Sequence, residues 1–265
     1  MSYRDKEYKT MLLSFEDPGI GIIQFNRPKA FNAVNLQFLD DIYEITVGLN
    51  EDPEVRAIIC TGNENCFAAG ADLKAVAGYN AFEARNFLDK VHRAVFAVED
   101  SPKPVIAAVN GLALGGGLEI ALACDIRIIA DNATLGLPEI SLGIYPGAGA
   151  TQRMPRNVPL GIAKQYVFTG DFFDAATADK IGLANMVVPA AEVMDTAKKL
   201  ARKLARKSPL ALRGAKQSLN NSMNLDIKSG CRFEQIGWSL LFAGEDQKEG
   251  MTAFLENRRA EFKGK

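Results

Sequence analysis

A glycine-rich turn between two apolar runs constrains this fold more than any other part of the sequence. Residues 105–109 are continuously apolar and 126–129 are apolar except for Arg127, which is typical of strands buried on both faces of a parallel sheet. Between them, Gly115, Gly116 and Gly117 precede a short helical pattern. Strand, turn, helix and strand predict a βαβ-type unit, and therefore an α/β fold with a buried sheet. The residues alone give no sign of a second such unit or of an internal repeat.

Further apolar runs and helical patterns alternate along the chain. Short apolar runs predict strands at 11–15, 20–25 and 55–61, and apolar residues at helical spacing predict helices at 35–50 and 82–100. After about residue 185 the pattern becomes helical and charged, with helices predicted at 191–207, 210–221, 231–243 and 249–262. We expect a core domain at 1–190 that holds the site, and a C-terminal helical region at 191–265 that packs on another subunit.

The charge balance and the shortage of histidine exclude several functions. With 31 Lys and Arg against 32 Asp and Glu, the chain lacks the basic field of a nucleic-acid-binding protein. The single histidine, His92, excludes a two-histidine zinc site, and we interpret it as a structural residue. Four cysteines without a Cys-x-x-Cys pair predict reduced thiols. The polar N-terminus and the lack of a long apolar run predict a cytoplasmic location without a membrane span. No metal is expected either.

Two glutamates stand in unusually apolar surroundings. Glu119 follows the three glycines, and its neighbours at helical spacing are glycine, leucine or alanine. Glu139 lies in a glycine-punctuated apolar loop. Either residue alone could be a rim or turn acid, but burial of both would raise their pKa values and suit general acid and base chemistry. Together they favour a site that adds or removes water across a double bond, or that moves a proton.

Two loops offer backbone amides to an anionic oxygen. The glycines at 115–117 allow close approach to a helix N-terminus, although tight helix packing would also explain them. A second small-residue turn, 66–74, follows a predicted strand, and Asp72 is expected to cap the next helix. The basic run 202–207 is interpreted as a solvated helix face.

Taken together, the segments resemble the crotonase, or enoyl-CoA hydratase, superfamily over nearly the whole chain. The segments that carry the resemblance are 26–33 (NRPKAFNA), 68–74 (AAGADLK), 104–111 (PVIAAVNG), 113–119 (ALGGGLE), 138–143 (PEISLG), 146–153 (PGAGATQR) and 249–254 (EGMTAF). The resemblance implies a spiral of stacked ββα units with a C-terminal helical region, assembled as a trimer or a dimer of trimers. It implies no cofactor besides the coenzyme A that forms part of the substrate.

The resemblance also implies roles for particular residues. The amides of Ala71 and Gly116 would form the oxyanion hole, Glu119 would act as base on a water molecule, and Glu139 would act as acid. The acyl-CoA channel would be lined by the following residues: Lys29, Ala30, Phe31, Ala69, Asp72, Leu73 and Lys74, with Phe254 closing it, often from the neighbouring subunit. Retention of both glutamates favours an enoyl-CoA hydratase, a hydro-lyase that adds water syn to a 2-enoyl-CoA.

Three departures from the family pattern keep alternatives open. Leu137 stands where many hydratases have glutamine, Ala150 replaces a glycine, and Asn257 stands where many members carry a lysine near the 3′-phosphate of CoA. Leu137 and Tyr145 could reshape the acyl pocket toward a cyclic or branched enoyl-CoA. Isomerisation of the double bond by Glu139 alone is a second hypothesis. A non-catalytic CoA- or RNA-binding scaffold is a third.

Overall fold

A computed structural model describes residues 2–63 and 65–265, and over these residues the strands form two sheets. The larger sheet has the order β1 (Met11–Glu16), β2 (Ile20–Phe25), β3 (Ala57–Thr61), β5 (Val105–Val109), β7 (Ile126–Ala130) and β10 (Met186–Val188). The smaller has the order β4 (Cys66–Ala68), β6 (Leu112–Leu114), β8 (Thr134–Gly136) and β9 (Phe172–Asp174). Antiparallel pairing is confined to β1 with β2 and β8 with β9, so most of both sheets is parallel.

The chain repeats one unit, passing from the larger sheet to the smaller and then into a helix. Strand β3 leads to β4 and α3 (Ala81–Glu99), and β5 leads to β6 and α4 (Gly116–Ala123). Strand β7 leads to β8 and the 3-10 helix η2 (Pro138–Leu142). The residues alone gave no sign of this repeat, whereas the family resemblance implied it. Strands β4, β6 and β8 have three residues each, too few to give a periodic signal in the sequence.

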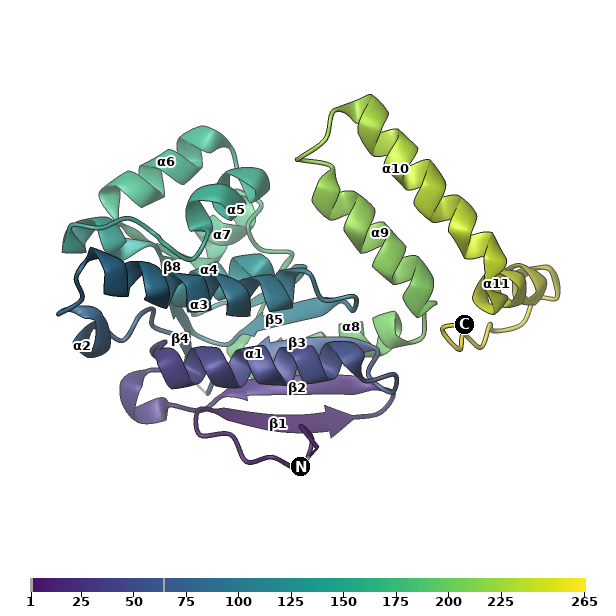
Figure 1. The fold of residues 1–265 in the computed structure, drawn as a ribbon, viewed down its shortest axis with the longest axis horizontal. Coiled ribbons are helices and arrows are strands. Elements are labelled where there is room, and N and C mark those ends of the chain that lie inside the picture. The colour runs from purple at the N-terminus through teal and green to yellow at the C-terminus, as the bar shows by residue number, and fades with distance from the viewer. Residues whose placement is uncertain (1, 64) are drawn as a thin grey trace.

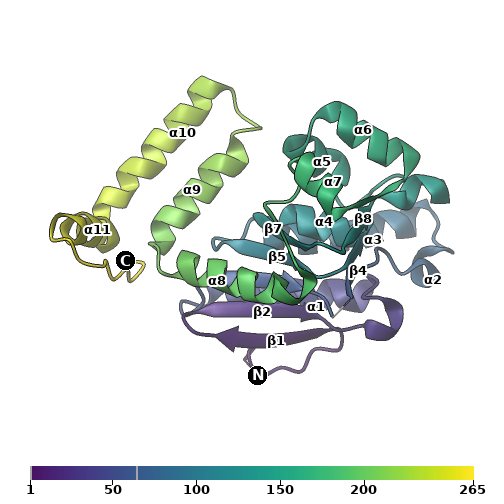
Figure 2. The ribbon, with the colours of Figure 1, turned by 180° about the vertical axis from the view of Figure 1, so that it is seen from behind.

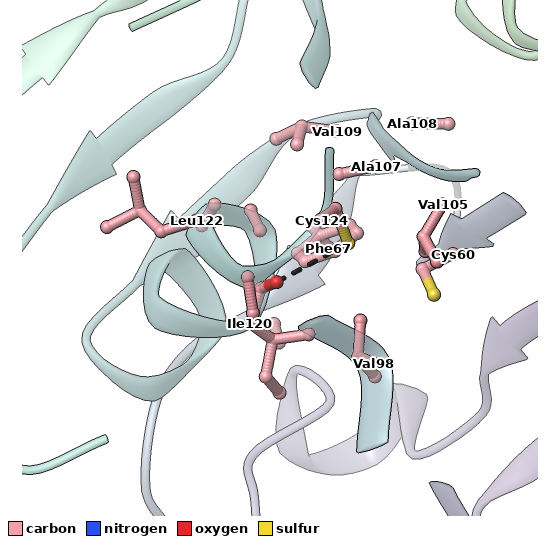
Figure 3. Packing of buried hydrophobic residues seen from close by; sticks show 14 of the residues in the cluster. Cys60, Phe67, Val98, Val105, Ala107, Ala108, Val109, Ile120, Leu122 and Cys124 are labelled. Carbon is pink, nitrogen blue, oxygen red and sulfur yellow. Dashed lines mark hydrogen bonds between the residues drawn. The ribbon is translucent and has the colours of Figure 1, made fainter. Parts of the chain in front are cut away.

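Helices cover both faces of the larger sheet. Helix α1 (Leu36–Glu51) packs on β1 and β2 and lies beside α3, whereas α8 (Val193–Ala205) crosses β2, β3, β5 and β7 from behind, as Figures 1 and 2 show from opposite sides. All five residues of β5 are buried, as the apolar run predicted. Figure 3 shows how side chains from β5, α3 and α4 fill the space around Cys124. The cysteines are unpaired, and three of the four are buried.

The last helices stand away from the sheets. Helices α9 (Pro209–Asn221) and α10 (Ile227–Leu240) pack on each other, and 3-10 helix η4 (Leu241–Ala243) joins α10 to α11 (Glu245–Leu255), as Figure 1 shows. The final helix was predicted at 249–262 but begins and ends earlier. Asp246 accepts hydrogen bonds from the amides of Lys263 and Gly264, so the last residues fold back as an extended tail instead of continuing the helix.

The remaining elements are short and lie at the edges of the core. They are η1 (Pro28–Ala30), α2 (Leu73–Val76), α5 (Ala150–Asn157), α6 (Leu160–Thr169), α7 (Ala175–Lys180) and η3 (Ala190–Glu192). Within residues 2–63 and 65–265, no helix combines the length and the apolar character that crossing a bilayer requires.

The aromatic cluster under α1 gives a test of the core. Phe38 is fully buried, and its ring centroid lies 5.0 Å from that of Phe25. Phe38→Ala should lower the free energy of unfolding by about 3–5 kcal/mol, because the cavity loses packing on every side. Phe82→Ala, which removes a ring that is 72% exposed on α3, is the matched control and should change it by less than about 0.5 kcal/mol. Urea unfolding measures both, and similar losses in the two variants would contradict this packing.

Candidate active site

Glu119 is a buried carboxylate held by two backbone amides. It lies in the first turn of α4 and is 2% exposed. Its Oε1 accepts hydrogen bonds from the amides of Ala148 and Ala150, both at 2.8 Å. Loss of solvation raises its pKa to about 7 and the negative charge of Glu139 adds to the rise, whereas the two amides oppose it. At neutral pH this carboxyl can both accept and release a proton, as general acid–base catalysis requires.

An arginine holds the loop that carries these amides. Arg153 donates through Nη1 to the carbonyl of Ala148 at 3.0 Å, and its Nε and Nη2 bind Glu99 of α3 at 2.8 and 2.5 Å. Gly149 has φ +110°, and a Cβ on it would lie 1.9 Å from Arg153 Nη1, so only glycine fits. The ion pair therefore fixes the loop, and the loop fixes the carboxylate of Glu119.

Glu139 lies across from the start of α4. Its Oε1 is 2.8 Å from where a Cβ on Gly115 would be, so a larger residue at 115 would displace it. Its Oε2 is one of three buried side-chain oxygen or nitrogen atoms that lack a hydrogen-bond partner among the described residues. Burial raises the pKa of Glu139, which favours its protonated form. An unpartnered oxygen beside a second carboxyl is placed to hold a small polar molecule.

The two amides expected from the sequence belong to residues that lie close together. Gly70 O accepts from Val34 N at 2.7 Å and Asp72 N donates to Val34 O at 2.9 Å, so the intervening amide of Ala71 points to the opposite side. Gly116 is the first residue of α4, and a Cβ on it would lie 3.9 Å from Ala71 N. Among the hydrogen bonds of the described residues, neither amide donates one. Two neighbouring N–H groups without a partner can stabilise an oxygen on which negative charge develops.

The structure brings most of the expected channel residues close to this site. Lys29 and Ala30 belong to η1, and the carbonyl of Phe31 accepts from Ala69 N at 3.0 Å, which joins the two loops. Phe31 and Leu73 expose about half or more of their surface. Lys74 follows, exposed, in α2.

Two expected residues lie differently. Asp72 occupies the position before α2 but does not cap it, because its carboxylate pairs with Arg27 at 3.0 Å. Phe254 lies on α11, and α11 and α2 lie on opposite sides of the molecule in both views (Figures 1 and 2). One chain alone therefore does not place Phe254 at this site.

Sequence reasoning missed the support behind Glu119. The segment 146–153 was noted for its resemblance only, yet Ala148, Ala150 and Arg153 are the groups that hold and polarise the carboxylate. The alternation of glycines at 147 and 149 was the available signal, since it permits a loop to present successive amides. Glu99 is 54 residues from Arg153 in the sequence, and no local pattern indicated that the two would pair.

His92 takes no part in this constellation. Its ring stacks on Phe96 with centroids 5.6 Å apart, and its Nδ1 is buried without a hydrogen-bond partner in the part of the chain described. This agrees with its interpretation as a structural residue.

Stacked ββα turns with two neighbouring carboxyls and two unpartnered amides are the arrangement that the resemblance to the crotonase superfamily implied. A model of the enoyl-CoA hydratase/isomerase family matches residues 16–265, and the chain belongs to that family. The expected fold class is thereby confirmed.

Individual relatives agree along almost the full length. The chain is 46% identical over 259 residues to a protein of Syntrophomonas wolfei named crotonyl-CoA hydratase, covering 96% of this chain and 98% of the relative. It is 44% identical to the short-chain-enoyl-CoA hydratase of Clostridium acetobutylicum, covering 91% and 93%. The crystal structure of an enoyl-CoA hydratase from Bacillus anthracis superposes with a TM-score of 0.94 at 38% identity, covering 97% of this chain and all of that one.

The charge of Arg153 gives a test of the site's electrostatics. In the wild type the Glu119 carboxyl should titrate with a pKa near 7. Arg153→Met should raise that pKa, because it removes a nearby positive charge and loosens the loop. Infrared difference spectroscopy across pH reports the protonated carboxyl band, which Glu119→Gln assigns. Arg156→Met, on an exposed arginine of the same helix, is the control and should leave the midpoint unchanged; a wild-type midpoint near 4.5 would contradict the burial argument.

Proposed function

We propose that this protein is an enoyl-CoA hydratase, a hydro-lyase that catalyses the reversible syn addition of water to a 2-enoyl-CoA to give a 3-hydroxyacyl-CoA. One observation carries the proposal: a buried and a half-buried carboxyl, both with raised pKa values, lie near two neighbouring amides that donate no hydrogen bond among the described residues. The family and the names of the close relatives support it. The chemistry proposed uses no metal and no redox cofactor, because amides supply the polarisation and carboxyls move the protons.

In the proposed mechanism the thioester oxygen binds between the amides of Ala71 and Gly116. Water attack on the β-carbon places negative charge on that oxygen as an enolate forms. Loss of one such donor typically costs about 3–4 kcal/mol of barrier. The N-terminus of α4 adds a favourable partial positive charge at the same point.

The two glutamates divide the proton transfers. Ionised Glu119 takes a proton from the water that attacks the β-carbon, and protonated Glu139 delivers a proton to the α-carbon. In the proposed syn addition both carboxyls act on the same face of the double bond. Both roles benefit from pKa values raised toward neutrality, since donor and acceptor then remain available together.

We propose a short-chain substrate, held by the loops that carry Lys29, Phe31 and Lys74. The relatives named for crotonyl-CoA and short-chain enoyl-CoA support this choice. Leu137 is fully buried, and Tyr145 is 70% exposed. Neither of these placements favours a cyclic or branched acyl group over a straight one.

Turnover of crotonyl-CoA tests the proposed function. Hydration should remove the enoyl-thioester absorbance, and kcat/KM should fall at pH values below about 7, because Glu119 must be ionised to act as base. Glu119→Gln and Glu139→Gln should each lower kcat by roughly 10²–10⁴-fold. Glu51→Gln, at an exposed position of α1, is the matched control.

Each rival function has its own outcome in the same assay. Conversion of a 3-enoyl-CoA to its 2-enoyl isomer, with no loss of crotonyl-CoA absorbance, would replace the proposal by an isomerase. Calorimetric binding of acyl-CoA without turnover of straight, branched or cyclic substrates would indicate a scaffold. Full hydratase activity in Glu119→Gln would overturn the division of roles.

We propose further that the protein is cytoplasmic and assembles as a trimer or dimer of trimers through residues 191–265. Because α8 packs on the larger sheet, α9 to α11 are the part that stands free to meet another chain. Their exposed large apolar side chains are Leu219, Met223, Leu225, Ile227, Phe233, Ile236, Trp238, Leu240, Phe242, Met251, Phe254 and Leu255. Exposed apolar side chains in this number on one part of the chain are typical of an interface. Neither a nucleic acid nor a membrane is a proposed partner.

Disruption of this apolar surface tests the assembly. Ile236→Asp should shift the sedimentation coefficient from that of three or six chains toward that of one, because it buries a charge in the contact. Gln165→Asp, at an exposed position of α6, adds the same charge and should leave the assembly unchanged. A wild-type protein that sediments as a single chain of 28.7 kDa would contradict the proposed trimer.

A further inference from the structure

Asn32 is a fully buried asparagine in the loop that follows η1. Its backbone has φ +55°, a left-handed conformation that asparagine adopts more readily than most residues. Its Nδ2 donates to the carbonyls of Cys66 at 3.0 Å and Phe67 at 3.1 Å, and its Oδ1 accepts from the amide of Arg27 at 2.8 Å. The sequence indicated none of these contacts with β4, because the two carbonyls lie 34 and 35 residues further along the chain.

The two carbonyls that Asn32 binds lie in an irregular part of β4. This strand is at the edge of the smaller sheet, and its pairing with β6 shifts register between Cys66 and Ala68. Such a shift disrupts the hydrogen bonds of the sheet locally, and a buried carbonyl without a donor is costly. The side-chain amide of Asn32 supplies the donors, and it thereby ties the loop at 31–34 to β4.

That loop is paired in turn with the segment that carries the Ala71 amide. Val34 N donates to Gly70 O at 2.7 Å, and Val34 O accepts from Asp72 N at 2.9 Å. These two hydrogen bonds lie on either side of Ala71 in the sequence. The position of the loop at 31–34 therefore sets where the N–H of Ala71 lies.

The segment after β4 also packs tightly against the start of α4. A Cβ on Gly117 would lie 2.0 Å from Ala68 O, and a Cβ on Gly70 would lie 3.6 Å from Gly116 N. Movement of the segment 68–71 would therefore change the separation of the Ala71 and Gly116 amides. A misplacement of about 1 Å in a reacting arrangement can lower its rate by roughly 100-fold.

We propose that Asn32 is a positioning residue for the hydration reaction. By holding the loop at 31–34 against β4, it sets the distance between the amides of Ala71 and Gly116. The inference rests on the proposed function, because it concerns the thioester oxygen that these amides polarise. Asn32 is fully buried, so it acts through Ala71 and does not itself bind the substrate. Its loss should lower kcat much more than it changes KM.

Infrared difference spectroscopy of bound butyryl-CoA, labelled with ¹³C at the thioester carbon, tests this role. The carbonyl of this saturated thioester reports its polarisation, and the compound has no double bond to hydrate. Binding to the wild type should lower the carbonyl stretching frequency. Asn32→Gly, which tolerates the positive φ, should lose most of that shift and lower kcat for crotonyl-CoA by about 10–100-fold. Asn32→Asp keeps the side-chain shape but places a carboxylate oxygen against the two carbonyls, so it should lose the shift as well.

Asn50→Ala is the matched control. Asn50 donates through Nδ2 to Ala97 O at 3.2 Å and accepts from Ser101 Oγ at 2.6 Å, so its loss also removes interior hydrogen bonds, but outside the loop at 31–34. It should leave the band shift and kcat unchanged, and thermal unfolding verifies that each variant is folded.

The band shift separates failure of this inference from failure of the proposed function. An unchanged shift and kcat in folded Asn32→Gly or Asn32→Asp would overturn the positioning role and leave the proposed function intact. Equal loss of the shift in Asn50→Ala would overturn it too, because any loosening of the core would then suffice. A wild-type protein that binds butyryl-CoA without a shift would contradict the amide pair itself, and with it both proposals.

Discussion

The burial of one carboxylate organises the centre of this molecule. A glutamate that is 2% exposed is costly to ionise in an apolar environment, so the surrounding structure has to stabilise its charged form. The amides of Ala148 and Ala150 do so directly, and Arg153 does so through the loop and through its charge. Glu99 completes the series by fixing Arg153 from α3. Four residues are thus positioned around a single proton-binding group.

The stacked repeat explains how distant segments meet at that group. Each turn of the chain ends its strand in the smaller sheet at a loop, and β4, β6 and β8 are neighbours there. The segments that directly follow them carry Ala71 in a loop, Gly116 at the start of α4 and Glu139 in η2. Glycine is required where these loops touch, at Gly70 with φ +93° and at Gly115 with φ +49°. The spacing of Ala71, Gly116 and Glu139 is therefore set by the pairing of β4, β6 and β8 in the smaller sheet.

Much of the fold and of the site was predictable from the sequence, because apolar strands, helical spacing and isolated acids leave local signals. The strand at 105–109 and the two unusual glutamates are examples. The sequence did not predict the three-residue strands, the role of Arg153 or its pairing with Glu99. Each of these depends on contacts between segments far apart in the chain. The family resemblance predicted the spiral of ββα units and the role of the Ala71 amide, neither of which the periodicity of the sequence indicated. For Asp72 the local pattern was misleading: it predicted a helix cap, but the carboxylate pairs with the distant residue Arg27 instead.

Because Glu119 and Glu139 act at one site, they determine how the reaction responds to the acidity of the solution. In the proposed cycle Glu119 gains a proton from the attacking water as Glu139 gives one to the α-carbon, so the pair holds one proton before and after the addition. Transfer of that proton back to Glu139 restores the starting state. The overall reaction consumes water but neither takes up nor releases a hydrogen ion. Acidity therefore sets the speed of turnover and leaves the final ratio of product to substrate unchanged. The direction of flux follows from the metabolite concentrations and not from any property of the protein.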